Sequence, residues 1–221
     1  MLIPLSVDVP MYRTPISNIV IVAVTVFYSL GGFANPESVE EAMLHGSSPG
    51  GLFSYMLFHG SLMHLLGNMI FLWVFGNAVC AKVGNGTYIL IYIAAGIAGG
   101  MAHLVLDGAP TIGASGAVNG IVGMYLIFYP LNNITCFYLI VIPIPPFCGT
   151  VSLSSMWIIL LWLVFDIWGV IGGGGPVAYW AHLGGFATGF GIGALLLLTG
   201  GIPMSDTECS LPDVLRGKAP H

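Results

Sequence analysis

The sequence predicts an all-α fold, a polytopic membrane helix bundle with six transmembrane helices, and two observations lead to this prediction. Hydrophobic residues make up 57% of the 221 residues and charged residues only 6%, whereas an average soluble domain is roughly 25% charged. So few charges cannot cover the surface of a water-soluble domain of this size. In addition, six apolar stretches approach the length of about 20 residues that a helix needs to cross the hydrocarbon core.

The six stretches lie at about residues 17–34, 61–81, 87–106, 115–131, 152–171 and 178–199. They show no strand-like alternation of apolar and polar residues, and a helix satisfies its own backbone hydrogen bonds in lipid. Residues 1–200 are therefore expected to form a single membrane domain. Residues 201–221 are expected to form a short polar tail that is at most partly ordered.

Two further segments need an interpretation. Residues 1–15 lack the order of a cleavable signal peptide, in which a positive stretch precedes a short apolar one and a small-residue cleavage site. We therefore expect the first membrane segment to be retained. Residues 132–149 are apolar but contain Pro143, Pro145 and Pro146, which break a helix. We interpret this stretch as an interfacial connector, with a seventh half-span as the alternative.

Four basic side chains determine the predicted orientation. Arg13 precedes the first stretch, Lys82 follows the second, and Arg216 and Lys218 follow the sixth. If the N-terminus is cytoplasmic, all four lie inside, as the positive-inside rule prefers. Both termini are then cytoplasmic, and the long loop at about residues 35–60 is external.

The small number of charges also limits the classes of partner. The net charge of −5 arises from four Lys and Arg residues against nine Asp and Glu residues, and no basic cluster suggests nucleic acid. The four cysteines are scattered, without a CxxC motif or zinc-like spacing, so we interpret them as buried or reduced thiols. No metal and no cofactor is expected.

Polar residues within membrane spans are costly and are therefore functional candidates, and the first of them is Ser115. It lies in Gly113-Ala114-Ser115-Gly116-Ala117 at the start of the fourth stretch. Small neighbours allow backbone amides and a substrate carbonyl to approach the serine oxygen closely, as acyl transfer requires. The alternative is helix packing, because small residues also mediate close contacts between membrane helices.

The second candidate is His182, at the start of the sixth stretch. Gly185 and Gly189 lie three and seven residues later, so they share its helix face and allow another helix to approach. An imidazole on such a face can act as a general base toward a partner helix. The alternative is a histidine that only satisfies its hydrogen bonds at a helix interface.

The third candidate is the group His59-x4-His64-x3-Asn68, which leads into the second stretch. His64 and Asn68 are four residues apart, so their side chains project together and could bind a developing oxyanion. A metal site is the alternative, but these histidines have no accompanying carboxylate, and the HExxH motif is absent.

The three groups share one level of the membrane in the predicted topology. Stretches two, four and six all begin on the external side, and each candidate lies within about the first two turns of its stretch. Packing residues without a common function would have no reason to share this depth, so the pattern favours an enzyme. Asp166, near the end of the fifth stretch, is interpreted as an interfacial carboxylate rather than as the third member of a catalytic triad.

In these motifs the sequence resembles the rhomboid family of intramembrane serine proteases, from about residue 15 to residue 200. The GxSG motif around Ser115, the histidines and Asn68 ahead of it, and Ala181-His182 with the two later glycines occur in the family's order. The resemblance implies a rhomboid-like fold in which Ser115 is the nucleophile, His182 is its base and no aspartate takes part. It also implies that His64, Asn68 and the backbone N–H of Ser115 bind the oxyanion.

The resemblance also implies supporting residues, and the sequence departs from the family pattern at two places. His59 corresponds to a family histidine that supports the loop structure. The family's aromatic residue one turn after the nucleophile is replaced by Asn119, which could hydrogen-bond His182 instead. A Trp-Arg pair that many members carry before the first histidine is replaced by the stretch Ser48-Pro49-Gly50-Gly51-Leu52-Phe53. The remaining supporting residues are the glycines Gly113, Gly116, Gly185 and Gly189.

The leading hypothesis is an intramembrane serine endopeptidase that cleaves transmembrane segments of membrane proteins near their outer ends with a Ser-His dyad. Its partners would be transmembrane protein substrates and the lipid bilayer, in a bacterial inner membrane, with the active site opening outward. The main alternative is a non-proteolytic rhomboid-like protein that binds membrane clients, although such a protein is expected to lack the serine or the histidine. A small transporter or channel would place polar residues across the membrane depth or show an internal repeat.

Overall fold

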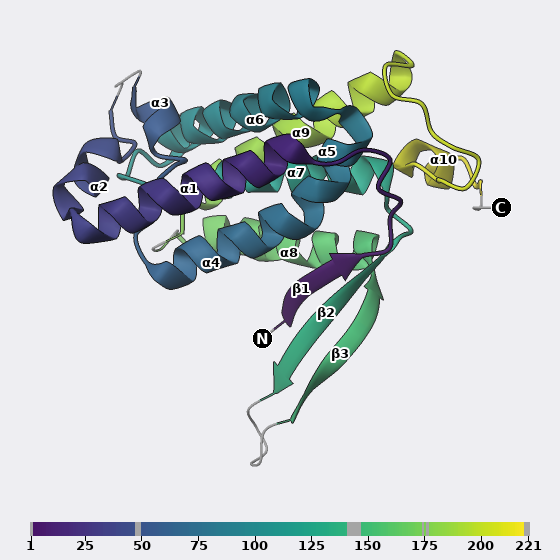
Figure 1. The fold of residues 1–221 in the computed structure, drawn as a ribbon, viewed down its shortest axis with the longest axis horizontal. Coiled ribbons are helices and arrows are strands. Elements are labelled where there is room, and N and C mark those ends of the chain that lie inside the picture. The colour runs from purple at the N-terminus through teal and green to yellow at the C-terminus, as the bar shows by residue number, and fades with distance from the viewer. Residues whose placement is uncertain (1, 47–49, 141–146, 174, 176, 219–221) are drawn as a thin grey trace.

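The structure is a bundle of helices from which a small antiparallel sheet extends (Figure 1). It is a computed structural model, and it describes residues 2–46, 50–140, 147–173, 175 and 177–218. The longest helices are α1 (Ile16–Ala34), α6 (Asn85–Leu106), α8 (Ser155–Ile171) and α9 (Tyr179–Leu198), with the shorter α7 (Ser115–Phe128) among them. Short helices are α2 (Pro36–Ala42), α3 (Gly51–Ser54) and α10 (Leu211–Leu215).

The second predicted span is a continuous helical segment with a π-helical turn in its middle. It consists of α4 (Leu62–Phe71), η1 (Leu72–Gly76) and α5 (Asn77–Val83). A π-helical turn interrupts the regular α-helical hydrogen-bond ladder, and a buried side chain from α1 bonds there. The Asn18 amide donates to the carbonyl oxygen of Leu72 at 2.9 Å and to Oδ1 of Asn77 at 2.8 Å, and the Tyr88 hydroxyl donates to Oδ1 of Asn18 at 2.6 Å. This network joins α1, the second span and α6.

Four helical segments of the described residues are long and apolar enough to cross a membrane: α1, the segment from α4 to α5, α6 and α9. The chain is therefore an integral, multi-pass membrane protein with a mostly helical fold, as predicted. Helices α7 and α8 are also apolar but have 14 and 17 residues, so the number of six crossings stays a prediction. Nearly every residue of α7 is buried, and a helix surrounded by protein has less need to span the whole hydrocarbon core.

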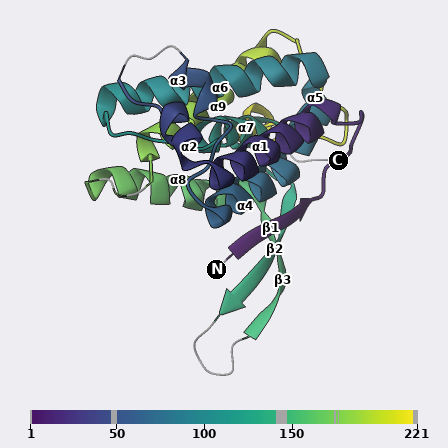
Figure 2. The same cartoon turned by 60° about the vertical axis from the view of Figure 1, so that its left-hand side comes forward.

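The interpretation of residues 132–149 as an interfacial connector is corrected by the structure. Here β2 (Asn133–Ile140) pairs antiparallel with β3 (Phe147–Ser154), and the N-terminal strand β1 (Leu2–Val7) pairs antiparallel with the other edge of β2. The strands were missed because strand pairing is not specified by local hydropathy: β2 lies between β3, which follows it in the chain, and β1, whose Leu2 lies opposite Tyr138. The three prolines of this stretch lie outside the described residues. Figures 1 and 2 show the sheet extending away from the helices on the side of α4 and α8.

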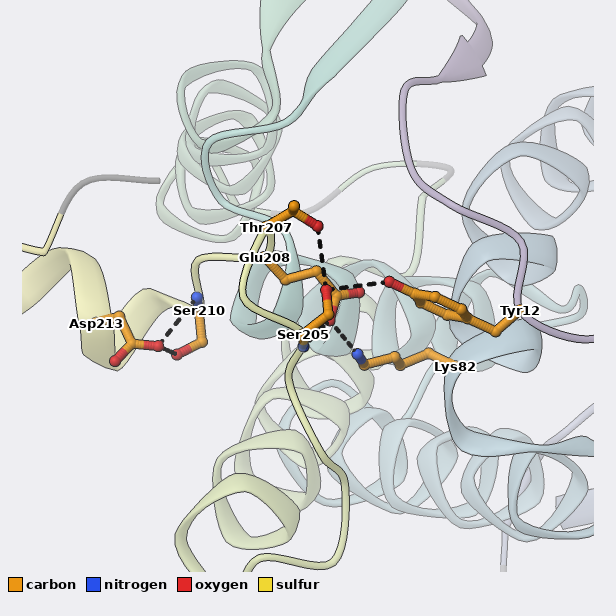
Figure 3. Close-up of polar contacts among 7 residues, drawn as sticks. All are labelled: Tyr12, Lys82, Ser205, Thr207, Glu208, Ser210 and Asp213. Carbon is orange, nitrogen blue, oxygen red and sulfur yellow. Dashed lines mark hydrogen bonds and ion pairs between the residues drawn. The ribbon is translucent and has the colours of Figure 1, made fainter. Parts of the chain in front are cut away.

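The C-terminal segment folds back onto the bundle, although the sequence suggested at most partial order. Lys82, at the end of α5, forms an ion pair with Glu208, and both side chains are almost fully buried. The Tyr12 hydroxyl lies 3.2 Å from the Ser205 hydroxyl, and the Lys82 ammonium lies 5.3 Å from the centre of the Tyr12 ring (Figure 3). Burial raises the pKa of Glu208, but hydrogen bonds from Lys82 and from the Ser205 N–H outweigh burial and hold that pKa below its usual value. The described part of the tail is thus fixed to α5 and to the N-terminal segment.

Glycines bring α7 and α9 into direct backbone contact. A Cβ atom added to Gly185 would lie 1.9 Å from the carbonyl oxygen of Gly116, and one added to Gly189 would lie 1.8 Å from that of Gly120. Both distances are far below any van der Waals contact, and the obstructing atoms belong to the backbone. A side chain at either position would therefore force the two helices apart.

Replacing Gly189 by alanine is expected to lower the stability of the bundle. The added methyl group must displace α7 from α9, and overpacking of this kind costs about 1–3 kcal/mol. The matched control is Gly191→Ala on the same helix, because a Cβ there meets nothing within 4 Å. Thermal unfolding in detergent should show a lower midpoint for Gly189→Ala than for Gly191→Ala, and equal midpoints would contradict the packing described here.

Candidate active site

A cavity of about 800 Å³ lies between α4, α7, α8 and α9. Six polar residues line it from the first two turns of α4, α7 and α9 and from the second half of α8: His64, Asn68, Ser115, Asn119, Asp166 and His182. Apolar side chains, among them Phe71, Trp162 and Phe165, form much of the remaining wall. The structure therefore brings the three predicted groups of polar residues into one space.

Ser115 is the first residue of α7 and follows a tightly held loop. Gly113 has a φ of +125°, which lies in the region that favours glycine, and its N–H donates to the carbonyl oxygen of Tyr55 at 2.8 Å. A Cβ added to Gly113 would also lie 2.6 Å from the His64 ring. Because the N–H of a first helical residue has no intrahelical partner, the backbone N–H of Ser115 can donate to another group.

His59 supports this loop through a hydrogen bond to the residue before Ser115. The Ala114 N–H donates to Nε2 of His59 at 3.3 Å, so the ring proton of the neutral imidazole resides on Nδ1. Nδ1 lies 3.0 Å from the Ser29 hydroxyl, which in turn donates to the carbonyl oxygen of Leu57 at 3.0 Å. The fully buried His59 side chain thus connects α1 to the residue that precedes Ser115.

His64 and Asn68 lie on consecutive turns of α4. The Ser61 hydroxyl caps this helix by accepting from the His64 N–H at 3.2 Å. One N–H of the Asn68 amide donates to the carbonyl oxygen of His64 at 3.0 Å, which leaves the second amide hydrogen for another acceptor. The rings of His59 and His64 meet edge to face with centroids 4.9 Å apart, so the two histidines hold each other in place.

The contact between α7 and α9 places Ser115 and His182 in neighbouring positions. Gly116, next to Ser115, packs against the backbone of Ala181, next to His182, and a Cβ added to Gly116 would lie 3.3 Å from the Ala181 carbonyl oxygen. Both side chains line the cavity. In the described structure no hydrogen bond joins the Ser115 hydroxyl to the His182 ring, and catalytic hydrogen bonds often tighten only when substrate is bound.

Asp166 is not the interfacial carboxylate that we expected. Its Oδ1 lies 2.9 Å from Nδ1 of His182, and the side chains of His182 and Asp166 are only 15% and 16% exposed. The last part of α8 therefore turns this carboxylate toward α9. A signal was present in the sequence, because an ionisable residue inside a membrane segment is a functional candidate with a partner to be found.

Asn119 also differs from the expectation. Its amide donates to the carbonyl oxygen of Ser115 at 3.0 Å, one turn earlier on α7. Among the described residues no hydrogen bond joins Asn119 to His182, and the His182 ring instead meets Asp166 and the edge of the Tyr179 ring, 6.2 Å between centroids.

The stretch that replaces the family's Trp-Arg pair is described only in part, because residues 48 and 49 lie outside the described residues. Gly51 and Leu52 begin helix α3. Ahead of them, Leu44 and Thr111 exchange two backbone hydrogen bonds of 2.8 and 3.0 Å. This pairing attaches the predicted external loop to the segment that leads into Ser115.

The buried His59 predicts how stability depends on pH. Burial, and to a lesser degree the neighbouring His64, lowers the pKa of His59 from its ordinary 6.5 to about 3. Between these two values the unfolded chain binds a proton that the folded chain does not bind. His59 therefore stabilises the fold fully above pH 6.5, and this contribution decreases as the pH falls below that value, by at most about 1.4 kcal/mol per pH unit.

The change to test this is His59→Gln, which removes the titrating group. The free energy of unfolding in detergent should fall more steeply for the unmodified chain than for His59→Gln as the pH is lowered from 6.5. Parallel curves for the two proteins would contradict the assignment of this pH dependence to His59.

Comparisons with known proteins identify the family of the chain. The family model described as the rhomboid domain matches residues 48–199, which is more than half of the chain. The chain is 35% identical over 109 residues to rhomboid protease GluP of Bacillus subtilis, a match that covers 47% of the chain and 21% of that protein. It is 29% identical over 137 residues to rhomboid protease GlpG of Klebsiella pneumoniae, with 62% of the chain and 45% of that protein covered.

A eukaryotic relative is found as well. Rhomboid protein 1, mitochondrial, of Saccharomyces cerevisiae is 31% identical over 144 residues, with 59% of the chain and 37% of that protein covered. The matched segments thus span less than half the length of each of these relatives. Since the family model covers the helices that carry Ser115, His182, His64 and Asn68, the chain belongs to the rhomboid family.

Proposed function

We propose that this protein is an intramembrane serine endopeptidase that uses Ser115 as its nucleophile and His182 as its general base. The observation that carries the proposal is the cavity in which Ser115 of α7 and His182 of α9 converge with His64 and Asn68 of α4. The names of two relatives as rhomboid proteases support it. No cofactor or metal takes part in the proposed chemistry.

The reaction starts with attack of the Ser115 Oγ on a peptide carbonyl carbon. The hydroxyl proton moves to Nε2 of His182, which later gives it to the leaving amine as the acyl-enzyme forms. A water molecule, activated by the same imidazole, then releases the acyl group and restores the serine. The glycine contact between α7 and α9 serves this step because it holds the nucleophile and the base on neighbouring backbones.

Three donors are proposed to bind the oxyanion of the tetrahedral intermediate. They are the His64 ring, the second hydrogen of the Asn68 amide and the backbone N–H of Ser115. Donors held in place before the reaction stabilise developing charge without reorganisation, and such stabilisation is often the largest catalytic term. The packing of the His64 ring against Gly113 and the local bond of Asn68 to the His64 carbonyl hold these groups in place.

The substrate class follows from the walls of the cavity. Phe71 and Trp162 lie with ring centroids 4.7 Å apart, and Phe165, which also lines the cavity, is 61% exposed. An apolar wall beside a lipid-facing helix suits a transmembrane segment of another protein. We propose that the site opens to the outer side of a bacterial inner membrane, that both termini are cytoplasmic, and that substrates are cut near their outer ends, where small or helix-breaking residues permit local unwinding.

The direct experiment is cleavage of a transmembrane reporter protein by the purified chain in lipid vesicles. Ser115→Ala and His182→Ala should each abolish cleavage, because each removes a group that the chemistry requires, while thermal unfolding stays close to that of the unmodified protein. A serine-directed fluorophosphonate should label the unmodified chain and not Ser115→Ala.

Matched controls are Ser6→Ala and His45→Ala, which change exposed residues of the same types far from the cavity lining. These variants should cleave at the unmodified rate. Cleavage that survives in both Ser115→Ala and His182→Ala would rule out the mechanism, and reporter binding without any cleavage by the unmodified chain would favour a client-binding role.

A further inference from the structure

We infer that Asp166 is a positioning residue for His182, which orients the base of the proposed Ser115–His182 pair. The inference rests on the proposed function, because it concerns the base of that same reaction. It starts from the 2.9 Å contact between Oδ1 of Asp166 and Nδ1 of His182, two side chains that come from different helices and are both mostly buried.

The contact determines which nitrogen of His182 carries the proton. An ionised carboxylate only accepts hydrogen bonds, so the neutral imidazole places its proton on Nδ1 and donates it to Asp166. Nε2 then carries the lone pair, as the general base requires. When the Ser115 proton moves to Nε2, both ring nitrogens are protonated, and the adjacent carboxylate stabilises the positive charge that has formed.

The surroundings explain why this role falls to Asp166. The Asn119 amide donates to the Ser115 carbonyl, and among the described residues no hydrogen bond joins it to the imidazole of His182. Among the described residues, other titratable groups that face His182 are Tyr179 on α9, whose ring meets the imidazole edge to face, and His64 on α4, which lines the same cavity. Neither supplies a negative charge at Nδ1, so the carboxylate of α8 does.

A second contact fixes the rotation of α8 that this geometry needs. Gly169 lies three residues after Asp166 and therefore on the same helix face, and a Cβ added there would lie 2.3 Å from the Tyr179 ring. The absence of a side chain lets Tyr179 pack directly on α8. Asp166 is thereby directed at His182, which lies on the same helix as Tyr179.

The test uses Asp166→Asn in the full chain, reconstituted in vesicles with the transmembrane reporter. An amide offers a donor as well as an acceptor, so it no longer selects the Nδ1–H form of His182. We expect kcat to fall by about 10²-fold or more with little change in KM. The acidic limb of the pH–rate profile should also move to lower pH, because the imidazolium has lost its negatively charged neighbour. Asp166→Glu, which keeps the carboxylate, should recover part of the rate.

The matched control is Asp107→Asn, which removes an exposed carboxylate at the end of α6 and should leave both the rate and the pH profile unchanged. A purely structural Asp166 would give Asp166→Asn a lower unfolding midpoint but an unmoved acidic limb, and this result would overturn the inference. A kcat of Asp166→Asn equal to that of the unmodified chain would also overturn the inference.

Different results would contradict the proposed function and the role of Asp166. If the unmodified chain neither cleaves the reporter nor is labelled at Ser115 by a fluorophosphonate, the proposed function fails and the inference fails with it. If the unmodified chain does both and Asp166→Asn matches it in kcat and in pH profile, only the role of Asp166 is wrong.

Discussion

The close approach of α7 and α9 is the constraint on which the rest of the site depends. Gly185 and Gly189 lie directly on the carbonyl oxygens of Gly116 and Gly120, with no room for a Cβ atom. In lipid, helices gain little from burying apolar side chains against each other, so van der Waals contact between backbones becomes a principal source of association. The same helix contact determines where Ser115 and His182 lie. Ser115 precedes Gly116, and His182 follows Ala181, whose backbone packs against Gly116. Stability of the bundle and geometry of the candidate site therefore have one physical origin.

The buried polar side chains follow from a second constraint, which is that unpaired polar groups in the membrane interior are expensive. Asn18 bonds the π-helical turn of the second span, and His59 bonds both the Ser29 hydroxyl and the Ala114 N–H. Along the chain, His59 precedes helix α4, which lines the cavity, and the π-helical turn that Asn18 bonds follows it. The two networks fix α4 to α1 and to the loop before Ser115, so that His64 and Asn68 are held by groups with no part in the proposed chemistry.

Much of the fold could be predicted from the sequence because helices in lipid are specified by local hydropathy. The second span was expected at about residues 61–81 and is found from Leu62 to Val83. The family could also be recognised, because each of its motifs is short and lies at the beginning of a single helix. The sheet could not be predicted in the same way, since β2 is defined by its pairing with β3 and with β1, from the N-terminal end of the chain, and not by local hydropathy. The contacts of the tail with Lys82 and Tyr12 depend on the assembled bundle for the same reason.

The residues of the candidate site also divide into those that local sequence predicts and those that depend on tertiary contacts. Ser115, His64, Asn68 and His182 have sequence signals of their own, and the structure places them around one cavity. Asp166 could be singled out only as an ionisable residue in a membrane segment. That its partner is His182 depends on how α8 is rotated against α9, and Tyr179 packs on Gly169 to set this rotation. Asn119 shows the opposite error: a residue expected to reach across to His182 instead bonds within its own helix.

The central claim is that Ser115 reacts with an acyl group whose oxygen is received by α4 and by the start of α7. A structure of the chain after reaction with a fluorophosphonate would test this claim most directly. The account predicts phosphorus bonded to Oγ of Ser115, with the phosphoryl oxygen within hydrogen-bond distance of the His64 ring, the Asn68 amide and the Ser115 N–H. An adduct on another residue, or a phosphoryl oxygen directed away from all three donors, would contradict it.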